Sequence, residues 1–500
     1  MPLGKPNIVL PLASSYDERG VAGFTDSQTN DYDQRKINCF YEVTKNAITG
    51  SGKIKLSKRP GISDSGNSYG VSGQTTFVAI TKPGGSFADG SATPWVFGVS
   101  SLTTIFAADS STSAAIVTAS GYIPAYVDKT LISGVETIVL QIRKDFTNSQ
   151  RAFYSATNSV SSFIEITHTN FTSLVHKGKM ESMDGFTFVL DNQNRIFTSS
   201  SNSLAAWGPA DFITKQVKQD FPVGLARLNN QILAFGNETV EVFYNAGNTA
   251  GSPLSPIRQL HQKIGLSIGV GNPVTATHYY AIIENRLYFI GRKAGGASSL
   301  GLYVYNGSSF QKISTQEMDK ILSTANIFSV NSVGFNGNAA IAISFTDPLA
   351  ITANWLMFFP EWNDWFEWKS TIFQPVNSGS NFLGLSQPTK TYIFSTGDAW
   401  ADAGTSYTMQ TQFKLPNDGA QNKFCQKVSV TGDTSTTAQG LLIEFSDDDY
   451  QTWNTAGTID LTQSEKYLTR LGRYYDRAYR ITSTTAAEVR LSSFNAWVSE

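Results

Sequence analysis

The segment Asn230-Gln-Ile-Leu-Ala-Phe235, followed by Thr239-Val-Glu-Val-Phe-Tyr244, contains the pattern that indicates the fold class. Its two short apolar runs flank a polar connection, as two β-strands flank a turn. Comparable runs recur about every 45–55 residues, a period at which three or four strands per unit are typical of a β-propeller. They are Phe186-Thr-Phe-Val-Leu-Asp191 with Arg195-Ile-Phe-Thr198; Tyr279 to Ile283 with Arg286-Leu-Tyr-Phe-Ile290 and Gly301-Leu-Tyr-Val-Tyr305; and Ala339-Ala-Ile-Ala-Ile343 with Trp355-Leu-Met-Phe-Phe359 and Trp365 to Trp368.

The composition of the whole chain agrees with an all-β fold. Its 500 residues include 32 Phe, 20 Tyr and 9 Trp, which favour strands. With 38 Lys+Arg and 40 Asp+Glu the formal net charge is −2, and only 16% of the residues are charged. Low charge with 41% hydrophobic residues argues against long disordered tails and against helical bundles. The near-neutral charge also excludes a positively charged nucleic-acid-binding surface that extends over the whole molecule.

Changes in this pattern divide the chain into four expected parts. Residues 1–34, rich in Asp, Ser, Thr, Asn and Gly, predict an extended arm. Residues 35–400 predict the β-propeller, with six or seven blades, and residues 401–424 predict a turn-rich connector. Residues 425–500 predict a separate small β-sandwich. No stretch of 18 apolar residues occurs, so we expect no membrane span.

Local signals predict one helix and two tight turns. Ser314, with Glu317 three residues later, forms a capping box at the start of a short amphipathic helix. Asn306-Gly307 and Asn336-Gly337 are dipeptides that favour tight turns.

Motifs for common enzyme chemistries are missing from the sequence. Gly50-Ser-Gly-Lys53 departs from a phosphate loop, and Gly70-Val-Ser-Gly-Gln74 from a nucleophile elbow. The four histidines have no zinc-like spacing with each other or with the two cysteines, which we expect to be free buried thiols. These residues are His168, His176, His261, His278, Cys39 and Cys425. We therefore expect no catalytic, cofactor-binding or metal-binding residues.

The run Ser446-Asp447-Asp448-Asp449-Tyr450-Gln451-Thr452-Trp453 looks like an Asp-box, with Tyr450 where Gly is usual. Three adjacent carboxylates are suited to a calcium site. They are also suited to a hairpin turn in which Asp side chains accept hydrogen bonds from backbone amides and Trp453 packs beneath. We favour the turn.

Three basic residues, Lys55, Lys58 and Arg59, precede Pro60-Gly61. They are candidates for phosphate contacts. We favour the interpretation that they flank a strand ending at a Pro-Gly turn.

Four tryptophans lie among acidic residues in one short segment. Carboxylates beside aromatic rings are what a glycosidase needs. Trp-rich adjacent strands are more often core or a subunit contact, and we favour that interpretation. The residues are Trp355, Trp362, Trp365, Trp368, Glu361, Asp364 and Glu367.

Three blocks of sequence, taken in order, carry a resemblance. The first is Arg35-Lys-Ile-Asn-Cys-Phe-Tyr-Glu42 with Lys58-Arg-Pro-Gly-Ile62. The second, over about 185–325, contains Ala206-Trp-Gly-Pro-Ala-Asp-Phe212, Gly224-Leu-Ala-Arg-Leu-Asn-Asn-Gln-Ile-Leu-Ala-Phe-Gly236 and Lys263-Ile-Gly-Leu266. The third is Phe445-Ser-Asp-Asp-Asp449 with Leu471-Gly-Arg-Tyr-Tyr-Asp-Arg-Ala-Tyr-Arg480. The order resembles that of podovirus tail hub proteins from short-tailed phages, also called nozzle or packaged-DNA stabilisation proteins. Residues 65–180 show no clear match.

The resemblance implies a structural virion protein of the phage tail with a propeller body and no enzymatic activity. It implies a ring of identical subunits, a hexamer, below the portal and its adaptor. The ring would retain packaged double-stranded DNA and conduct it during ejection, in contact with tail fibre, spike or needle proteins. We expect any DNA binding to be weak, independent of sequence and sensitive to salt.

Two other functions fit a polar propeller without a catalytic signature. One is a carbohydrate-binding or glycan-degrading tail propeller, for which convergent acids near Trp362 to Trp368 would be the diagnostic feature. The other is a monomeric adhesion module.

Overall fold

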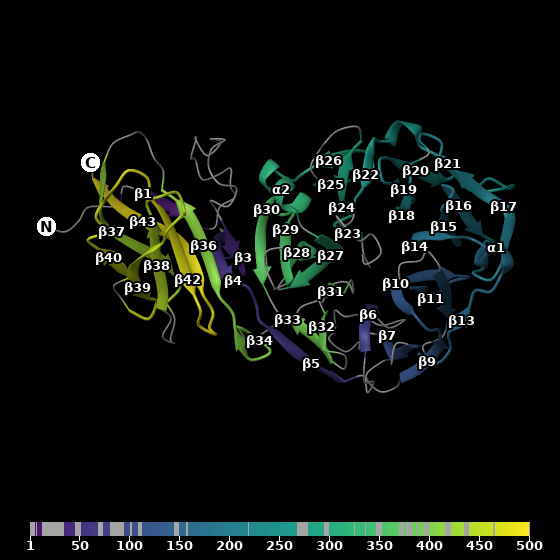
Figure 1. Cartoon of the computed structure of the whole chain (residues 1–500), viewed down its shortest axis with the longest axis horizontal. Coiled ribbons are helices and arrows are strands. Elements are labelled where there is room, and N and C mark those ends of the chain that lie inside the picture. The colour runs from purple at the N-terminus through teal and green to yellow at the C-terminus, as the bar shows by residue number, and fades with distance from the viewer. Residues whose placement is uncertain are drawn as a thin grey trace. The chain divides into compact units, whose positions relative to one another are not determined.

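A computed structural model of the chain is almost entirely β-structure and divides into two compact units (Figure 1). The larger unit comprises Asp64–Ala353 and Ile372–Ile393, and the smaller unit comprises Met1–Ser63, Asn354–Thr371 and Phe394–Glu500. The structure describes residues 6, 8–12, 35–45, 52–68, 74–80, 95–100, 103–108, 113–144, 150–156, 159–218, 220–267, 279–294, 300–324, 326–335, 337–346, 353–369, 375–376, 383–387, 390–394, 400–415, 422–434, 440–463 and 466–499.

The larger unit is a β-propeller, as the repeat predicts, because its chain forms small sheets one after another (Figure 1). Four successive sheets each contain four strands in chain order. They contain β6 (Gln74–Ile80), β7 (Trp95–Ser100), β8 (Thr104–Ala108) and β9 (Ser113–Thr118); β10 (Tyr122–Ile132), β11 (Val135–Lys144), β12 (Gln150–Ser155) and β13 (Ile164–Glu165); β14 (His176–Met183), β15 (Phe186–Asp191), β16 (Arg195–Ser199) and β17 (Trp207–Thr214); and β18 (Pro222–Leu228), β19 (Gln231–Gly236), β20 (Val240–Asn245) and β21 (Leu254–Pro256).

The remaining strands of the larger unit form further small sheets. The next sheet has the order β22-β24-β25-β26, with β23 beside β24. Its strands are β22 (Ile264–Leu266), β23 (Tyr280–Ile283), β24 (Arg286–Lys293), β25 (Gly301–Tyr305) and β26 (Phe310–Lys312). The others are the hairpin of β27 (Asn326–Phe335) and β28 (Asn338–Thr346), and the sheet of β31 (Pro375–Val376), β32 (Leu383–Gln387), β33 (Lys390–Phe394) and β5 (Ile62–Ser68). The number of blades, six or seven, remains a prediction.

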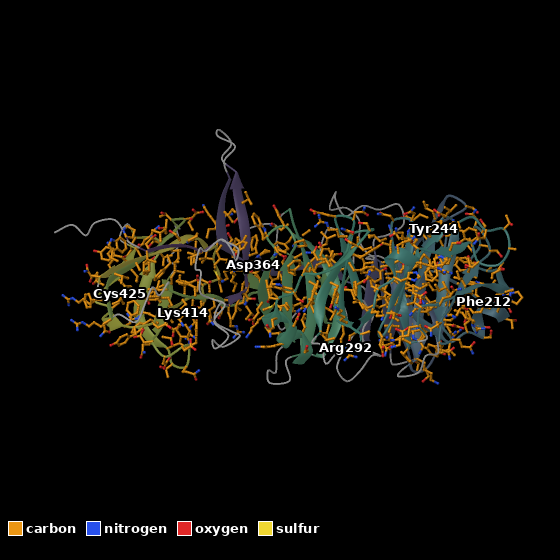
Figure 2. The ribbon with its side chains drawn as sticks, turned by 90° about the horizontal axis from the view of Figure 1, so that it is seen from above. Phe212, Tyr244, Arg292, Asp364, Lys414 and Cys425 are labelled. Carbon is orange, nitrogen blue, oxygen red and sulfur yellow. The ribbon has the colours of Figure 1, made fainter. Side chains whose placement is uncertain are left out.

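Apolar side chains fill the spaces between successive sheets (Figure 2). Phe97 packs with Leu140 between the first two sheets, and Phe188 packs with Leu225 between the third and fourth. The middle strands β15 and β19 are therefore buried on both faces, with only their first residue partly exposed. This explains why they read as continuous apolar runs rather than alternating ones.

The capping signal correctly predicts a helix, but the first turn begins one residue later than expected. Helix α2 spans Gln316–Thr324, and the Thr315 hydroxyl accepts a bond from the Met318 amide at 3.4 Å. Ser314 instead accepts from the Leu302 amide at 3.0 Å and donates to Asp319 at 2.6 Å. The side chain of Glu317 lies outside the described residues. Two other short helices lie in the described residues, α1 (Thr169–Thr172) and the 3₁₀ turn η3 (Arg258–Leu260).

The smaller unit contains two sheets built from distant parts of the chain, together with the separate two-stranded pair β34-β35. One has the order β3-β4-β43-β37-β40, with β1 beside β43 and β41 beside β37; the other includes β29-β30-β2-β36-β42-β38-β39. The strands are β1 (Ile8–Pro11), β2 (Lys36–Ile37), β3 (Cys39–Lys45), β4 (Gly52–Lys58), β29 (Ala353–Phe359), β30 (Asp364–Lys369), β34 (Ala401–Asp402), β35 (Thr405–Ser406), β36 (Met409–Lys414), β37 (Lys423–Gly432), β38 (Gly440–Ser446), β39 (Asn454–Asp460), β40 (Tyr467–Thr469), β41 (Arg473–Tyr474), β42 (Ala478–Ser483) and β43 (Arg490–Ser499). The ring of Phe494 joins the two sheets by contacting Phe413 and Tyr479, with centroids 5.0 and 4.8 Å away.

The expected domain boundaries differ from these units. Residues 36–58, assigned to the propeller by sequence, form strands of the smaller unit because β4 pairs with β43 and β2 pairs with β36. The expected connector, 401–424, contains β36, which pairs with β42 over six residues. Residues 425–500 therefore share both sheets with earlier strands, and an independent sandwich over that range remains unsupported. Of the arm over 1–34, only residues 6 and 8–12 are described, and β1 pairs with β43.

No helix in the described part of the chain is long and apolar enough to cross a membrane.

Candidate functional site

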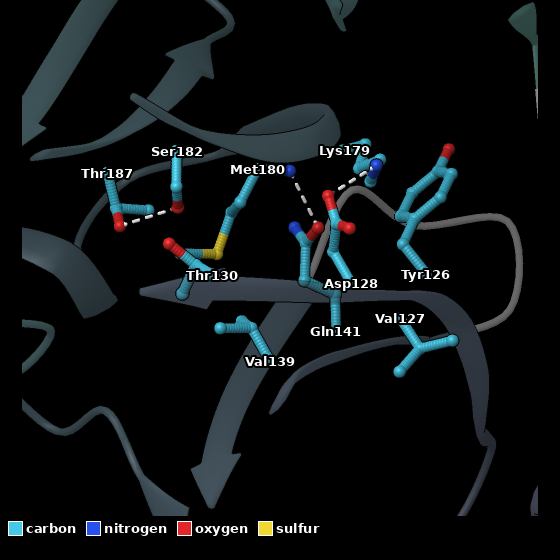
Figure 3. A pocket seen from close by; sticks show the side chains of 10 residues that line it. All are labelled: Tyr126, Val127, Asp128, Thr130, Val139, Gln141, Lys179, Met180, Ser182 and Thr187. Carbon is cyan, nitrogen blue, oxygen red and sulfur yellow. Dashed lines mark hydrogen bonds and ion pairs between the residues drawn. The ribbon is translucent and has the colours of Figure 1, made fainter. Parts of the chain in front are cut away.

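A cluster of polar side chains in the larger unit lies at the pocket in Figure 3, which is lined by three of its five members, Tyr126, Asp128 and Lys179. Tyr126 and Asp128 come from β10, Lys179 and Glu181 from β14, and Tyr280 from β23. Each of these is the first or second strand of its sheet, so the cluster connects three different sheets. No sequence motif identified it, because the five residues come from three strands that are far apart in the sequence.

The polar groups of this cluster bond mainly to one another. The Lys179 ammonium lies 2.6 Å from Asp128 and 3.6 Å from Glu181. It also donates to the Tyr280 hydroxyl at 3.3 Å, and that hydroxyl donates to Glu181 Oε1 at 2.5 Å. Buried charges are tolerated when they are paired and hydrogen-bonded in this way.

A bulge in β14 brings these groups to the cluster. The register between β14 and β15 shifts between Lys177 and Glu181, and Gly178 has a φ of 68°. A Cβ at Gly178 would lie 2.5 Å from the Cα of Gly224, so the close approach of β14 to β18 requires glycine. The amides freed by the bulge find side-chain acceptors. Lys179 N donates to the Tyr279 hydroxyl at 3.0 Å, and Met180 N donates to Gln141 Oε1 at 2.7 Å.

Burial and charge shift the ionisation of the cluster. Burial raises the pKa of Glu181 to about 7, although Lys179 acts in the opposite direction. Burial alone would lower the pKa of Lys179, but Asp128 and Glu181 hold it well above its usual range. Burial also raises the pKa of Tyr280. At neutral pH, Lys179 is therefore charged, while Glu181 is close to its midpoint.

The other polar groups that line the pocket are also bonded within the protein. Ser182 and Thr187 share a hydrogen bond of 2.9 Å (Figure 3). Gln141 bonds to Gln150 at 3.2 Å. This arrangement fixes the first strands of neighbouring sheets against each other. Its chemistry is that of a structural polar cluster rather than of a nucleophile with an open binding cavity.

The acidic residues beside the tryptophans do not converge on an open site. Asp364 (labelled in Figure 2) is buried, pairs with Lys36 and accepts from the Tyr41 hydroxyl at 2.6 Å. Glu367 accepts two hydrogen bonds from Arg35, at 2.7 and 2.5 Å. These pairs attach β2 to β30, which run parallel at Ile37 and Glu367.

The tryptophans of this segment belong largely to the core, as the favoured interpretation predicted. Trp355 and Trp368 are buried, and Trp368 donates through Nε1 to the Cys39 carbonyl at 2.9 Å. Trp362 and Trp365 are half-buried, and Glu361 is exposed in the turn before β30.

The basic residues before the Pro-Gly turn form hydrogen bonds and ion pairs with other residues of the smaller unit. Arg59 is buried and donates to both oxygens of Asp402, at 2.9 and 2.5 Å, and it lies 3.8 Å from the ring centroid of Tyr407. Lys58 donates to the Thr485 carbonyl at 2.5 Å, and burial, followed by Arg59, lowers its pKa to about 8. Lys55 pairs with Asp433 at 2.5 Å. Strand β4 ends at Lys58, as expected, whereas phosphate contacts by Lys58 and Arg59 are excluded by their burial.

The Asp triplet forms the expected turn, and each carboxylate has a protein partner. Asp447 pairs with Arg477 at 2.5 and 2.6 Å, and Asp449 lies 3.4 Å from Lys414. Asp448 accepts from the Thr452 amide at 2.9 Å and from Ser446 at 2.7 Å. Hydrogen bonds from Thr452 and then Ser446 lower the pKa of Asp448 to about 2.

Two features of this turn differ from the expectation. Tyr450 adopts the left-handed φ of 66° that usually favours glycine. Trp453 is half-buried rather than buried, and the Arg480 guanidinium lies 4.2 Å from its ring centroid. Within the described ranges, no three His, Cys, Asp or Glu side chains are grouped to hold a metal ion.

His168 and His176 make local hydrogen bonds, whereas the ring nitrogens of His261 are buried without a hydrogen-bond partner among the described residues. His176 is buried, contacts the Phe171 carbonyl at 3.1 Å, and has its pKa lowered by burial to about 4. His168 accepts from the Asn170 amide at the start of α1. Cys39 and Cys425 are free and buried, as expected. His278 lies outside the described residues.

A model of one protein family matches residues 22–348, and its description is Bacteriophage P22 Gp10, beta-propeller. No curated protein matches the chain.

Solved structures show only a distant likeness. BBS1N, in a crystal structure with ARL6DN, has 10% identity and a TM-score of 0.39, covering 68% of this chain and 98% of that chain. The computationally designed Ika8 protein has 11% identity and a TM-score of 0.32, covering 60% and 93%. An exo-β-1,3-galactanase from Phanerochaete chrysosporium has 9% identity and a TM-score of 0.27, covering 87% and 100%. None of these three likenesses supports an argument about function.

Proposed function

We propose a function from the premise that this chain belongs to the phage stabilisation family, whose model is described as Bacteriophage P22 Gp10, beta-propeller. The chain is accordingly a structural protein of the bacteriophage virion, located in the tail. Its family is one of packaged-DNA stabilisation proteins of podoviruses.

Within the tail, we place the chain as one subunit of a ring-shaped hub, or nozzle, below the portal and adaptor. The ring retains packaged double-stranded DNA and conducts it during ejection. The observation that carries this proposal is the family match over 22–348, which covers the strands from β2 to β28. Tail fibre, spike or needle proteins are the partners proposed beyond the ring.

A ring of identical subunits requires heterologous interfaces whose rotation closes. We propose six subunits, from the family resemblance. Because neighbouring sites on an adaptor raise the effective concentration of subunits, closure needs only modest affinity between each pair. The isolated chain is therefore expected to be a monomer or a weak oligomer.

A glycan-degrading role has no specific observation in its favour. Asp364 and Glu367, two of the three acids that it would require, are held by Lys36 and Arg35. The low-scoring galactanase likeness adds nothing to it. We therefore propose that the chain is not an enzyme.

Electron cryomicroscopy of purified particles tests this function. A gold-labelled or epitope-tagged copy should lie in the tail axis below the adaptor, in six copies per particle. As a control, light scattering measures the mass of the isolated protein, which should be that of a monomer or weak oligomer if the ring closes only on the adaptor. A stable two-fold dimer in both solution and particles, or a position away from the DNA path, would contradict the proposal.

A further inference from the structure

One part of the larger unit has a strong surplus of positive charge. Between residues 242 and 316 the only acidic residue is Glu284, whereas six residues are basic. The net charge of this stretch is 6 − 1 = +5, in a chain whose total is −2. The basic residues are Arg258, Lys263, Arg286, Arg292, Lys293 and Lys312.

The strand register separates the single acid from a basic edge. Glu284 lies in the turn between β23 and β24, beside Arg286, at the start of β24. Arg292 is near the other end of β24, about 20 Å away at the usual rise of a strand. There, Gly265 of β22 pairs with Arg292, and the Lys263 carbonyl accepts from the Ala294 amide at 2.9 Å.

Arg258, Lys263 and Arg292 define this basic edge, and all three side chains are exposed. Arg258 belongs to η3, shortly before β22, and Arg292 is labelled in Figure 2. Among the described residues, none of these three cations has an ion pair or a side-chain hydrogen bond. The adjoining segments 268–278 and 295–299 contain no Asp or Glu in their sequence.

Glu238, an acid in the loop against β22, does not neutralise the edge. A Cβ at Gly265 would lie 2.3 Å from the Glu238 amide nitrogen, so the loop that carries Glu238 lies against β22. The Glu238 carboxylate is paired with Lys218. The local surface therefore keeps its positive surplus.

We propose that the basic edge binds the phosphate backbone of double-stranded DNA, an inference that rests on the proposed function. Exposed Arg and Lys side chains contact phosphates without reading bases, and each contact releases counterions from the DNA. In the described part of this region, the three cations lie on or beside a 3₁₀ turn of three residues and strands that pair within their own sheet, and none of these can enter a groove. Binding is therefore weak, independent of sequence and steeply dependent on salt.

The acidic side chains of a second copy are a poorer match for this edge. Many carboxylates of the smaller unit are already in ion pairs within their own subunit. These pairs are Glu42–Arg490, Asp364–Lys36, Glu367–Arg35, Asp402–Arg59, Asp447–Arg477, Glu444–Arg480 and Asp433–Lys55. DNA phosphates have no such internal partners, which favours DNA as the occupant.

Fluorescence anisotropy of the full chain with a labelled 30-base-pair duplex of mixed sequence tests the proposal. The triple variant Arg258→Gln, Lys263→Gln and Arg292→Gln should bind at least tenfold more weakly at 50 mM salt. The slope of log affinity against log salt should fall by up to about 2.7, since each phosphate contact contributes about 0.9.

A matched control removes three cations from the opposite end of the sheets, with Lys129→Gln, Arg227→Gln and Arg286→Gln. This variant loses the same charge and should bind within about twofold of the native protein. Melting curves of both variants check that the fold is kept. Equal losses of DNA affinity in the two variants would mean that net charge alone attracts DNA, and would overturn the proposal. Native-like DNA binding by the first variant would also overturn it.

Particle assembly separates this inference from the proposed function. If the first variant enters the tail normally yet binds the duplex like the native chain, the basic edge is wrong and the tail function stands. If the variant binds the duplex normally but fails to enter particles, the edge binds a virion protein and the proposal is overturned. If the native chain is found away from the DNA path, the proposed function fails, whatever the duplex measurements give.

Discussion

The hydroxyl of Tyr280 donates a 2.5 Å hydrogen bond to the carboxylate of Glu181, joining β23 to β14 inside the propeller. Both side chains are buried, and Lys179 contacts both of them. The bond is therefore part of the polar cluster that holds neighbouring sheets together. It also gives that cluster a testable dependence on sequence and on pH.

Removing the Tyr280 hydroxyl should destabilise the larger unit. We expect Tyr280→Phe to lower the free energy of unfolding by about 1–3 kcal/mol, because Glu181 loses a buried donor. The control is Tyr305→Phe, whose hydroxyl donates to the neutral Gln231 amide at 2.6 Å, and which should lose only about 0.5–1.5 kcal/mol. Urea titrations measure both. Equal losses would show that the charge of Glu181 is unimportant to this bond.

The contribution of Glu181 to stability should decrease as the pH rises. Its pKa is raised from 4.5 to about 7 in the folded protein, so the folded state binds the proton more tightly than the unfolded state. The resulting stability is full below about pH 4.5 and is lost as the pH rises through 7. The native protein should therefore lose on the order of 2–3 kcal/mol relative to Glu181→Gln between pH 4.5 and pH 8.

Comparing the two proteins at each pH removes the effect of other groups. His176 has a lowered pKa of about 4, so its contribution changes in the opposite direction, but it is present in both proteins. A difference between native protein and variant that is flat with pH would contradict the buried titration of Glu181.

The buried ion pair of Arg59 and Asp402 should be far more sensitive than an exposed one. Asp402→Ala leaves the buried guanidinium unpaired, and we expect a loss of about 3–5 kcal/mol. Asp433→Ala, which breaks the pair of an exposed carboxylate with Lys55, should cost less than about 1 kcal/mol. Chemical denaturation of the two variants checks this order. Similar losses would mean that burial does not govern the Arg59 pair.

Within the Asp turn, the structure changes the expected ranking of substitutions. The sequence alone favours Trp453→Ala as the severe change, with Asp449→Ala mild. Because the Arg477 side chain is 2% exposed and Trp453 is half-buried, we now expect Asp447→Ala to cost the most, about 3–5 kcal/mol. Trp453→Ala should be intermediate, and Asp449→Ala should remain the mildest. Thermal melts of the three variants test the order.

A chelator distinguishes the turn from an ion site. EDTA should leave the melting temperature of the native protein unchanged, because the three carboxylates already have protein partners. A drop of many degrees that calcium reverses would show that the Asp triplet binds an ion.

Local patterns in the sequence were enough to predict the all-β class, the propeller repeat and the individual strands. Apolar runs such as Gln231 to Phe235 form strands where the structure describes them. Apolar residues that alternate with polar ones indicate a strand buried on one face, and a continuous apolar run indicates a strand buried on both faces. The short helix α2 and the Asp turn also follow from neighbouring residues, since their stabilising hydrogen bonds span only a few positions.

Only the tertiary structure decided which distant strands and charges meet. Arg59 pairs with Asp402, Arg35 with Glu367, and residues 36–58 join the smaller unit through partners hundreds of positions away. The bulge that gathers Lys179, Glu181 and Tyr280 likewise depends on the contact of Gly178 with Gly224. Periodicity specifies how a strand is buried but not which strand lies beside it, because many strands of this chain have the same pattern. Pairing is settled when the whole core packs, and the basic edge at Lys263 and Arg292 is visible only then.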